Sequence, residues 1–245
     1  MKYSSTISNI PNHKIEDFIY SYKIDKAKHN FYLVLKRLID IIFSGTVLFL
    51  TAPLMVLLIL LIKLESKGPA FYLQERIGKF GKIFKVYKLR TMYIDYEEKG
   101  GGIKTIDDDP RITKTGKLIR RISFDEFPQF INILKGEMSY IGPRPISLAE
   151  HLIVMNGLKS ENKPIPQGLI PMVKPGITGW ALLHGREKIS YKDRFKLNAQ
   201  YENNISLWFD LKIFLLTFKK YWFTNLCVLI LFLSFTAFIC IKIII

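Results

Sequence analysis

The apolar segment from Leu38 to Ile62 constrains the fold of this chain more than any other feature. Asp40 is its one charged residue, and the remaining positions are apolar or small. About 20 apolar residues in a helix are enough to cross the hydrocarbon core of a bilayer. We therefore expect this segment to lie in a membrane and the rest of the chain to fold around that attachment.

Pro53, near the middle of the segment, predicts a structural break, because proline removes a helix hydrogen bond and clashes with the preceding turn. Basic residues flank both ends, with Lys36-Arg37 before the segment and Lys63 and Lys67 after it. A simple span should carry its lysines and arginines mainly on one side. The symmetric basic flanks suit a re-entrant helix hairpin that enters and leaves on one face, but the residues alone do not favour it over a simple span. A kinked transmembrane helix stays open, because spanning helices tolerate proline.

The formal net charge of +15 at pH 7 indicates anionic partners such as nucleic acid, anionic lipid or phosphorylated substrates. Nucleic acid is disfavoured, because the chain carries no recognised nucleic-acid-binding motif. Cys227 and Cys240 lie in an apolar tail, without metal-site spacing or a disulfide framework. The four histidines are scattered, so sequence neighbours form neither a zinc site nor a Ser/His/Asp arrangement.

Residues 70–92 change to a period of two, which predicts a β-hairpin around a turn at 78–81. Its second strand alternates apolar and basic side chains. Lys85, Lys88 and Arg90 are close in sequence, although strict alternation puts Lys85 on the face opposite the other two. A solvated strand face is the alternative explanation of these charges.

Asp125 and Glu126 are adjacent carboxylates that follow the pair Arg120-Arg121. Ser123 and Glu126 have the spacing of a capping box, which predicts that a helix begins here. Asp125 would then lie in the first turn, where the helix dipole and the arginines favour its ionised form and lower its pKa. Such a carboxylate can be a nucleophile or a metal ligand. Plain helix capping is the alternative.

The acidic segment before Pro110 has a simple interpretation. Three aspartates at 107–109 precede Pro110, and we expect a loop there rather than a metal site, because Asp-Pro is a routine turn signal.

Helical patterning after the carboxylate pair ends at Lys135-Gly136. Beyond it, two prolines hold Arg144 in a stiff turn that suits bidentate phosphate binding. Lys174 to Trp180 forms a second rigid loop, and neither loop is a Walker or dinucleotide motif.

Several short blocks follow one another from about residue 31 to about residue 221. They are Lys36-Arg37-Leu38-Ile39-Asp40 with the mid-helix proline, Gln74-Glu75-Arg76-Ile77-Gly78, Tyr87-Lys88-Leu89-Arg90-Thr91-Met92, Asp109-Pro110-Arg111-Ile112-Thr113, Ser123-Phe124-Asp125-Glu126-Phe127-Pro128-Gln129, Gly142-Pro143-Arg144-Pro145 and Pro175-Gly176-Ile177-Thr178-Gly179-Trp180. In this order they resemble the monotopic polyprenyl-phosphate phosphoglycosyltransferases, the bacterial sugar transferase family. Any one block is weak evidence, but the shared order over most of the chain is specific.

The resemblance implies a reaction. Members of that family move a phosphosugar from a nucleotide diphosphate sugar, usually a UDP-sugar, to undecaprenyl phosphate, use Mg²⁺ and release UMP. By carry-over, Asp125 is the nucleophile that takes the phosphosugar as an acyl phosphate, and Mg²⁺ is expected at Asp125. Glu126 assists in proton handling or positioning. The phosphate-binding residues implied are Arg144 and Arg120, with Arg90, Lys36 and Arg37 as weaker candidates.

The chain departs from the family in two places. Relatives often have Ser-Pro at the membrane break, where this chain has Ala52-Pro53, and the neighbouring Thr51 is an uncertain substitute for the serine hydroxyl. The apolar tail from Leu226 to Ile241 has no counterpart in small family members. Its length is near the lower end of a membrane span.

The expected fold is α+β and mostly helical. A re-entrant membrane helix hairpin would carry a small cytoplasmic catalytic domain with a β-hairpin and interfacial amphipathic helices. One such helix is expected within Asp193 to Trp222 because of its apolar residues Trp208, Phe209, Leu211, Phe214, Leu215 and Phe218. The expected parts are a variable lead-in at 1–32, the anchor at 33–66, the catalytic domain at 67–221 and a hydrophobic, possibly transmembrane, tail at 222–245.

We therefore expect an enzyme at the cytoplasmic face of a bacterial cell membrane that primes surface polysaccharide or glycan synthesis. Its partners would be the nucleotide sugar, the polyprenyl phosphate and the membrane, and a homo-oligomer stays open. A catalytically silent membrane scaffold in such a pathway is the alternative function. A membrane-tethered nucleic-acid binder is suggested by charge alone.

Overall fold

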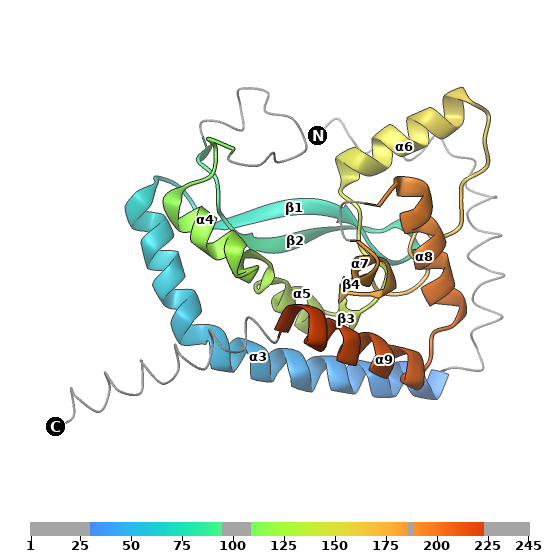
Figure 1. Ribbon diagram of the computed structural model, residues 1–245, viewed down its shortest axis with the longest axis horizontal. Coiled ribbons are helices and arrows are strands. Elements are labelled where there is room, and N and C mark those ends of the chain that lie inside the picture. The colour runs from blue at the N-terminus through green and yellow to red at the C-terminus, as the bar shows by residue number, and fades with distance from the viewer. Residues whose placement is uncertain (1–29, 95–108, 186–188, 223–245) are drawn as a thin grey trace.

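The computed structural model describes residues 30–94, 109–185 and 189–222 (Figure 1). The predicted lead-in up to residue 29 and the tail from residue 223 lie outside this range. The elements, in chain order, are the helices and strands α3 (Asn30–Glu65), β1 (Phe71–Ile77), a 3₁₀ turn (Lys79–Gly81), β2 (Ile83–Leu89), α4 (Lys114–Arg121), a 3₁₀ turn (Phe124–Glu126), α5 (Gln129–Lys135), β3 (Ser139–Ile141), α6 (Leu148–Ser160), β4 (Gly176–Thr178), α7 (Trp180–Leu183), α8 (Tyr191–Asn203), α9 (Leu207–Thr217) and a π-helical turn (Phe218–Trp222).

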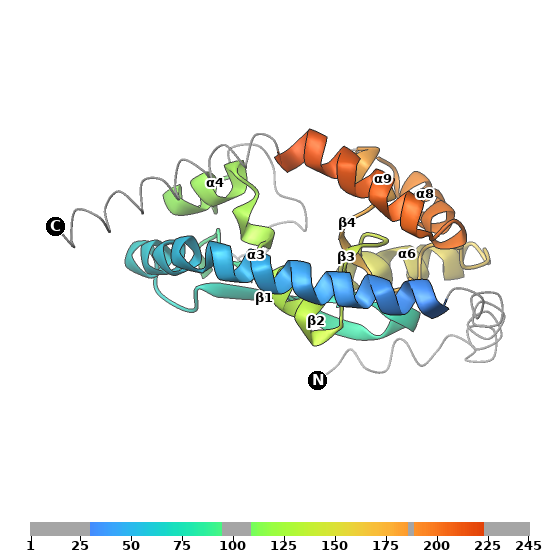
Figure 2. The same cartoon turned by 90° about the horizontal axis from the view of Figure 1, so that it is seen from below.

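The described part of the chain is mostly helical, with two small sheets, as the sequence predicts. β1 and β2 form an antiparallel hairpin, and β3 and β4 form a parallel pair. The long helix α3 runs along one side of the molecule, and the other elements gather against it (Figures 1 and 2). α4 lies toward the C-terminal end of α3, α8 and α9 lie toward its N-terminal end, and the hairpin runs from the C-terminal end of α3 across to α6 (Figure 1).

α3 is one helix of 36 residues that contains Pro53. It changes direction part-way along its length, so that it has two limbs (Figure 1). Proline is a common cause of such a bend, because its nitrogen cannot donate to the carbonyl four residues earlier. The expected break is therefore a bend within a continuous helix, and a re-entrant path through the membrane stays a prediction.

Thr51 takes no part in repairing that bend. Its hydroxyl donates to the carbonyl of Val47 at 2.7 Å, four residues earlier. The carbonyl that Pro53 leaves without its helical donor is that of Phe49. Thr51 therefore does not take the role considered for a serine hydroxyl at this break, which agrees with the doubt raised by the sequence.

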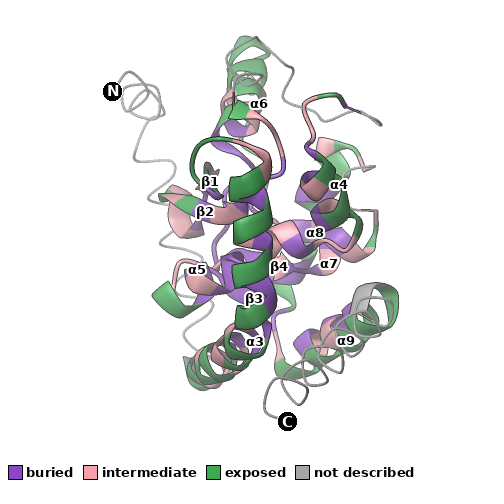
Figure 3. Cartoon of the chain, turned by 90° about the vertical axis from the view of Figure 1, so that its left-hand side faces the viewer, coloured by how far each residue is buried: buried purple, intermediate pink, exposed green. Residues whose placement is uncertain are grey.

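Large apolar side chains remain exposed along the outer side of α3. Phe31, Phe49 and Leu64 are each more than 80% exposed. Figure 3 shows that exposed residues cover much of the helix surface that faces away from the protein. Within the described residues, Phe31–Glu65 is the one stretch of helix long and apolar enough to cross a membrane. Exposed apolar surface of this extent marks an interaction site, and the composition of α3 favours lipid.

The range Asp193 to Trp222, which was predicted to include an interfacial helix, holds most of α8 and all of α9. Asn204–Ser206 separates α8 from α9, and the Ser206 hydroxyl caps α9 by accepting from the backbone N–H of Phe209. Apolar side chains of α9 such as Trp208 and Leu215 are exposed. The predicted apolar residues from Trp208 to Leu215 lie on α9, which begins after Ser206 because serine is a favourable N-cap. An interfacial role for α9 stays a prediction.

Both limbs of α3 pack against the rest of the chain. On the first limb, Val47 joins a core that includes Phe130, Ile133, Tyr140 and Ile213, from α5, β3 and α9. On the second limb, a separate core surrounds Leu58. Its members are Leu54, Met55, Leu58, Ile62, Ala70, Leu89, Ile119 and Phe124. Phe124 belongs to the 3₁₀ turn that carries Asp125, so the second limb supports that turn.

Polar contacts fix the ends of α3. At its start, Asp210 of α9 accepts from Lys36 and from the hydroxyl of Tyr32. At its end, the carboxylate of Glu65 accepts from the backbone N–H groups of Lys114 and Thr115 at 2.6 and 2.8 Å. Because α4 begins at Lys114, the latter bonds satisfy donors that a helix N-terminus leaves open. Both ends of α3 are therefore tied to the same folded unit.

Replacing Leu58 with alanine tests whether the second limb packs on protein. Leu58 is 3% exposed and lies within the core described above. We expect Leu58→Ala to destabilise the protein by about 2–5 kcal/mol, as buried leucine truncations do. Thermal unfolding of the detergent-solubilised protein would measure the change. Leu60→Ala is the matched control, because Leu60 lies on the same limb and is 55% exposed. Equal effects of the two substitutions would contradict the packing of this limb.

Candidate active site

The adjacent carboxylates Asp125 and Glu126 lie on a short 3₁₀ turn between α4 and α5. The predicted capping box is wrong. Ser123 has a left-handed conformation, with φ 52° and ψ 30°, and its side chain makes no capping bond. The helix that follows begins only at Gln129. A helix N-cap normally has an extended backbone, and the left-handed backbone of Ser123 does not have that geometry.

Aromatic side chains fix this turn. Phe124 is buried against the second limb of α3, and its ring stacks on that of Phe127 at a centroid distance of 4.0 Å. Phe127 in turn meets Phe130 of α5 edge-on. The aromatic residues fill the core side of the turn, and Glu126 between them lines a small polar pocket.

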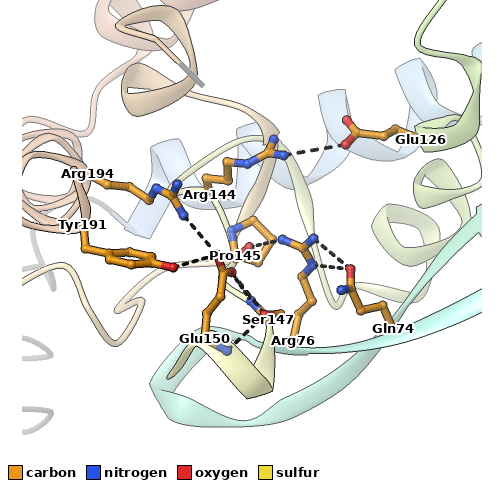
Figure 4. Close-up of polar contacts among 9 residues, drawn as sticks. All are labelled: Gln74, Arg76, Glu126, Arg144, Pro145, Ser147, Glu150, Tyr191 and Arg194. Atoms are coloured by element: carbon orange, nitrogen blue, oxygen red, sulfur yellow. Dashed lines mark hydrogen bonds and ion pairs between the residues drawn. The ribbon is translucent and has the colours of Figure 1, made fainter. Parts of the chain in front are cut away.

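Two cations from distant segments converge on Glu126. Lys88 of β2 places Nζ 3.6 Å from Oε1 of Glu126, and Arg144 places Nη2 3.7 Å from the same oxygen. Figure 4 shows Arg144 directed toward Glu126 from the loop before α6. All three side chains are mostly buried, at 12–17% exposure. Ion pairs in such surroundings are screened by solvent far less than surface pairs.

Asp125 has a raised pKa, opposite to the direction predicted from the sequence. Removal from solvent is the main cause, and the neighbouring charge of Glu126 adds to it. Lys88 and Arg120 oppose the rise. The predicted lowering of this pKa was wrong because burial, which disfavours the charged form, outweighs the nearby positive charge. The carboxylate is therefore more basic than an ordinary aspartate.

Arg120 lies beside Asp125 as predicted. It belongs to the last turn of α4, and its Nε donates to the hydroxyl of Thr91 at 2.8 Å. This bond orients the guanidinium, and its charge lowers the pKa of Asp125. Arg120 and Arg144 are thus the two predicted phosphate-binding residues that the fold brings to the carboxylate pair.

The other three predicted phosphate-binding residues make structural contacts. Arg90 is buried and donates to the carbonyls of Ser66 and Lys67, which closes the turn between α3 and β1. Arg37 donates to the carbonyls of Ile133 and Leu134 at the end of α5. Lys36 pairs with Asp210. We therefore assign Arg90, Arg37 and Lys36 to the fold rather than to phosphate binding, since a donor held by a buried acceptor is costly to release.

A small pocket adjoins Glu126 and is lined mainly by polar and charged groups. Its lining residues are Arg76, Val86, Lys88, Glu126, Gln129, Arg144, Pro145, Gly176 and Ile177. The loop that carries Gly176 approaches very closely, because a Cβ on Gly176 would lie 2.1 Å from the backbone nitrogen of Gly142. Only glycine allows this contact between the two rigid loops. Arg76, Lys88 and Arg144 outnumber Glu126 in this lining. The pocket therefore carries an excess of positive charge, which suits an anionic ligand.

Lys88 and Arg76 line the pocket but were not predicted as site residues. Lys88 was part of a basic strand with a solvated face as the alternative explanation, yet it is enclosed among Asp125, Glu126, Arg76 and Arg144. Burial lowers its pKa, and Glu126 opposes that change. Strand alternation could have indicated that Lys88 belongs to the site, because it places Lys88 and the exposed Lys85 on opposite faces of β2.

The acidic residues do not form a preassembled metal cage. Among the residues that the structure describes, no group of three or more His, Cys, Asp or Glu side chains is placed to hold a metal ion. Asp109, the described member of the three aspartates before Pro110, is buried and pairs with Arg111 at 2.6 Å. This aspartate therefore belongs to the loop, as expected.

A search against protein families decides the assignment. The model described as bacterial sugar transferase matches residues 31–224. The chain belongs to the bacterial sugar transferase family. This confirms the resemblance seen in the sequence blocks and makes the chain an enzyme of the transferase class.

Individual relatives agree with this assignment. The uncharacterized sugar transferase EpsL of Bacillus subtilis is 39% identical, over 77% of this chain and 87% of EpsL. The UDP-glucose:undecaprenyl-phosphate glucose-1-phosphate transferase of Escherichia coli is 39% identical over 76% of this chain and 40% of that protein. An Aeromonas hydrophila UDP-N-acetylgalactosamine-undecaprenyl-phosphate N-acetylgalactosaminephosphotransferase is 40% identical over 77% and 44%. The chain spans less than half the length of the last two relatives.

Substitution of Lys88 in this sugar transferase should move the pH dependence of activity. Loss of the Lys88 charge removes one of the two cations that hold down the pKa of Asp125. We expect the acidic limb of kcat/KM to move upward by about 1 pH unit in Lys88→Met, because Asp125 then needs a higher pH to ionise. The measurement is a pH–rate profile.

Lys85→Met is the matched control for this experiment. Lys85 lies on the same strand, but it is exposed and faces the other way. Its substitution should leave the acidic limb in place. An unchanged limb in Lys88→Met, or an equal shift in Lys85→Met, would show that Lys88 does not set the pKa of the carboxylate pair.

Proposed function

We propose that this sugar transferase moves a phosphosugar from a nucleotide diphosphate sugar, most simply a UDP-sugar, to undecaprenyl phosphate. The observation that carries the proposal is the Asp125–Glu126 pair, held among Lys88, Arg120 and Arg144. The Escherichia coli and Aeromonas hydrophila relatives are named for this type of reaction. A positively charged pocket beside a basic carboxylate suits nucleophilic attack on a phosphoryl group.

The proposed reaction has two steps. An oxygen of the Asp125 carboxylate attacks the phosphorus that bears the sugar, the bond from that phosphorus to the bridging oxygen breaks, and UMP leaves with that oxygen. An aspartyl-phosphosugar intermediate remains. A phosphate oxygen of undecaprenyl phosphate then attacks the same phosphorus and releases the Asp125 carboxylate. Splitting one transfer into two displacements in this way is the usual gain of covalent catalysis.

The surrounding side chains have separate proposed roles. The raised pKa of Asp125 makes its carboxylate a better nucleophile than an ordinary aspartate once it is ionised. Arg144 and Arg120 bind donor phosphate oxygens, for which the planar guanidinium is well suited. Glu126 holds Arg144 and Lys88 in place and can exchange a proton with the leaving or attacking phosphate.

The residues present also fit Mg²⁺. This ion prefers oxygen ligands and commonly uses one or two carboxylates together with substrate phosphates, without a complete protein cage. Two adjacent carboxylates without a third acidic partner match that pattern among the described residues. Asp125 would hold the ion, with Glu126 as its neighbour, and the ion would neutralise charge on the donor diphosphate.

The contacts at the two ends of α3 support a re-entrant path. Both ends of this helix are tied to the same folded unit, the first through Asp210 and the second through the start of α4. A straight span would instead place its ends on opposite sides of a bilayer about 30 Å thick. We therefore propose a re-entrant path, which keeps the site on the cytoplasmic face where soluble nucleotide sugars are available. The product would prime surface polysaccharide or glycan synthesis.

Substitution of the nucleophile tests the mechanism. Asp125→Asn should lower transfer at least about 1,000-fold, since nucleophile removal typically has effects of this size or larger. It should also abolish the sugar-phosphate adduct on the protein, while thermal unfolding stays near that of the wild type. The assay uses purified protein, a panel of UDP-sugars, undecaprenyl phosphate and Mg²⁺, with intact-protein mass spectrometry for the adduct. Asp109→Asn controls for loss of a buried aspartate outside the pocket. A wild-type protein without activity would favour the silent scaffold, and an active Asp125→Asn would contradict the covalent mechanism.

Cysteine labelling tests the re-entrant path. In a variant that lacks Cys227 and Cys240, single cysteines are placed at Ser8, before α3, and at the exposed Lys159 of α6. Both should resist a membrane-impermeant thiol reagent in intact cells and react after lysis, because both would lie on the cytoplasmic side. Labelling of Ser8→Cys from outside, with Lys159→Cys protected, would show that α3 spans the membrane.

A further inference from the structure

The loop that carries Arg144 is held from several sides. Its first part is bound to the neighbouring loop, because Gly142 donates to the carbonyl of Thr178 and Gly176 donates to that of Pro143, both at 2.9 Å. Its last part leads into α6, whose first turn has a complete capping box formed by Ser147 and Glu150. Arg144 lies between these two anchored ends.

Arg76 of β1 binds this loop directly after Arg144. Its Nη1 donates to the carbonyl of Pro145, and the backbone N–H of Ile77 donates to the carbonyl of Ile146 at 3.1 Å. Figure 4 shows the Arg76 guanidinium between Pro145 and Gln74. β1 therefore fixes the backbone on the C-terminal side of Arg144 with one side-chain bond and one main-chain bond.

The orientation of Arg76 is itself fixed by Gln74. Oε1 of Gln74 accepts from Nε of Arg76 at 3.2 Å and from Nη2 at 2.8 Å. The two residues lie on the same face of β1, because strand side chains alternate. The planar guanidinium thus uses one edge for Gln74 and directs Nη1 toward Pro145. A lysine at this position could not satisfy both partners with the same geometry.

Glu150 anchors the other side of the loop end. It accepts from the backbone and hydroxyl of Ser147, and the hydroxyl of Tyr191 donates to it at 3.3 Å. Arg194 of α8 lies 3.9 Å from the same carboxylate. β1 and α8 therefore hold residues 145–147 from two directions, and the side chain of Arg144 extends from this support toward Glu126 (Figure 4).

We propose that Arg76 is a positioning residue for Arg144: it holds the carbonyl of Pro145, and so the guanidinium of Arg144, in the place from which Arg144 binds a donor phosphate. The inference rests on the proposed function, because it assigns Arg144 to the phosphates of the nucleotide sugar. Displacement of a binding group by about 1 Å can cost as much as about 100-fold in rate. A contact one residue from Arg144 can therefore matter to catalysis, and because Arg76 also lines the pocket, the test must separate an effect through Arg144 from direct contact with the donor.

A double-mutant cycle tests this proposal. Arg76→Lys, Arg144→Lys and the double variant are compared with the wild type by kcat/KM for the nucleotide sugar, using the full-length protein in detergent. Arg76→Lys keeps the charge but loses the planar fork. We expect it to lower kcat/KM by at least about fivefold in the wild-type background and by less than about twofold in the Arg144→Lys background. A loss that acts only through Arg144 must disappear when the Arg144 guanidinium is absent.

Arg111→Lys is the matched control. Arg111 also binds its partner through several guanidinium nitrogens. That partner is Asp109, two residues earlier and outside the loop that carries Arg144. Any effect of Arg111→Lys should be the same in both backgrounds. Equal effects of Arg76→Lys in the two backgrounds would overturn the proposal, as would an Arg144→Lys variant with wild-type kinetics. An inactive wild type would instead contradict the proposed function.

Gln74→Leu provides a second variant in case Arg76→Lys does not fold. It leaves Arg76 in the chain but removes the oxygen that orients its guanidinium. We expect a smaller loss of kcat/KM, again confined to the background that has Arg144. Thermal unfolding of each variant distinguishes misfolding from displacement, and an Arg144-independent loss in Gln74→Leu would also overturn the proposal.

Discussion

The candidate active site depends on the compensation of two adjacent, partly buried carboxylates by cations from different parts of the chain. Asp125 and Glu126 repel each other when both are ionised, and burial adds to the cost. Lys88, Arg120 and Arg144 offset that cost from β2, α4 and the loop before α6. Removing any of these segments would leave a buried charge uncompensated, so the site requires the complete fold.

The bent helix α3 is the common support of these segments. Its second limb packs beneath Phe124 and Ile119, and so positions the turn with the carboxylates and the helix with Arg120. Its first limb meets α5, β3 and α9. Asp40 within α3 accepts from the backbone N–H of Tyr140 at 2.9 Å, which anchors β3 just before the loop that carries Arg144. One apolar element, which is also the candidate membrane helix, thereby aligns the polar site.

Local patterns predicted the local structure well where one signal dominated. The period of two gave the β-hairpin, and Gly136 ends α5 in the left-handed conformation expected after Lys135. Competing signals misled the prediction at Ser123, where capping-box spacing suggested an α-helix and the chain forms a 3₁₀ turn. A true capping box occurs at Ser147 and Glu150, which have the same spacing. Spacing alone therefore does not separate the two, because the flanking helices and aromatic contacts decide which one forms.

The sequence by itself determined the candidate membrane segment, the carboxylate pair and the family, because each depends on residue type and order along the chain. Only the tertiary structure decided which cations serve the pair. Arg90, Arg37 and Lys36 hold backbone carbonyls or Asp210, whereas Lys88 and Arg76 enter the pocket. It also decided that burial raises the pKa of Asp125 despite nearby arginines. Burial and charge separation depend on distances in space, which the order of residues does not contain.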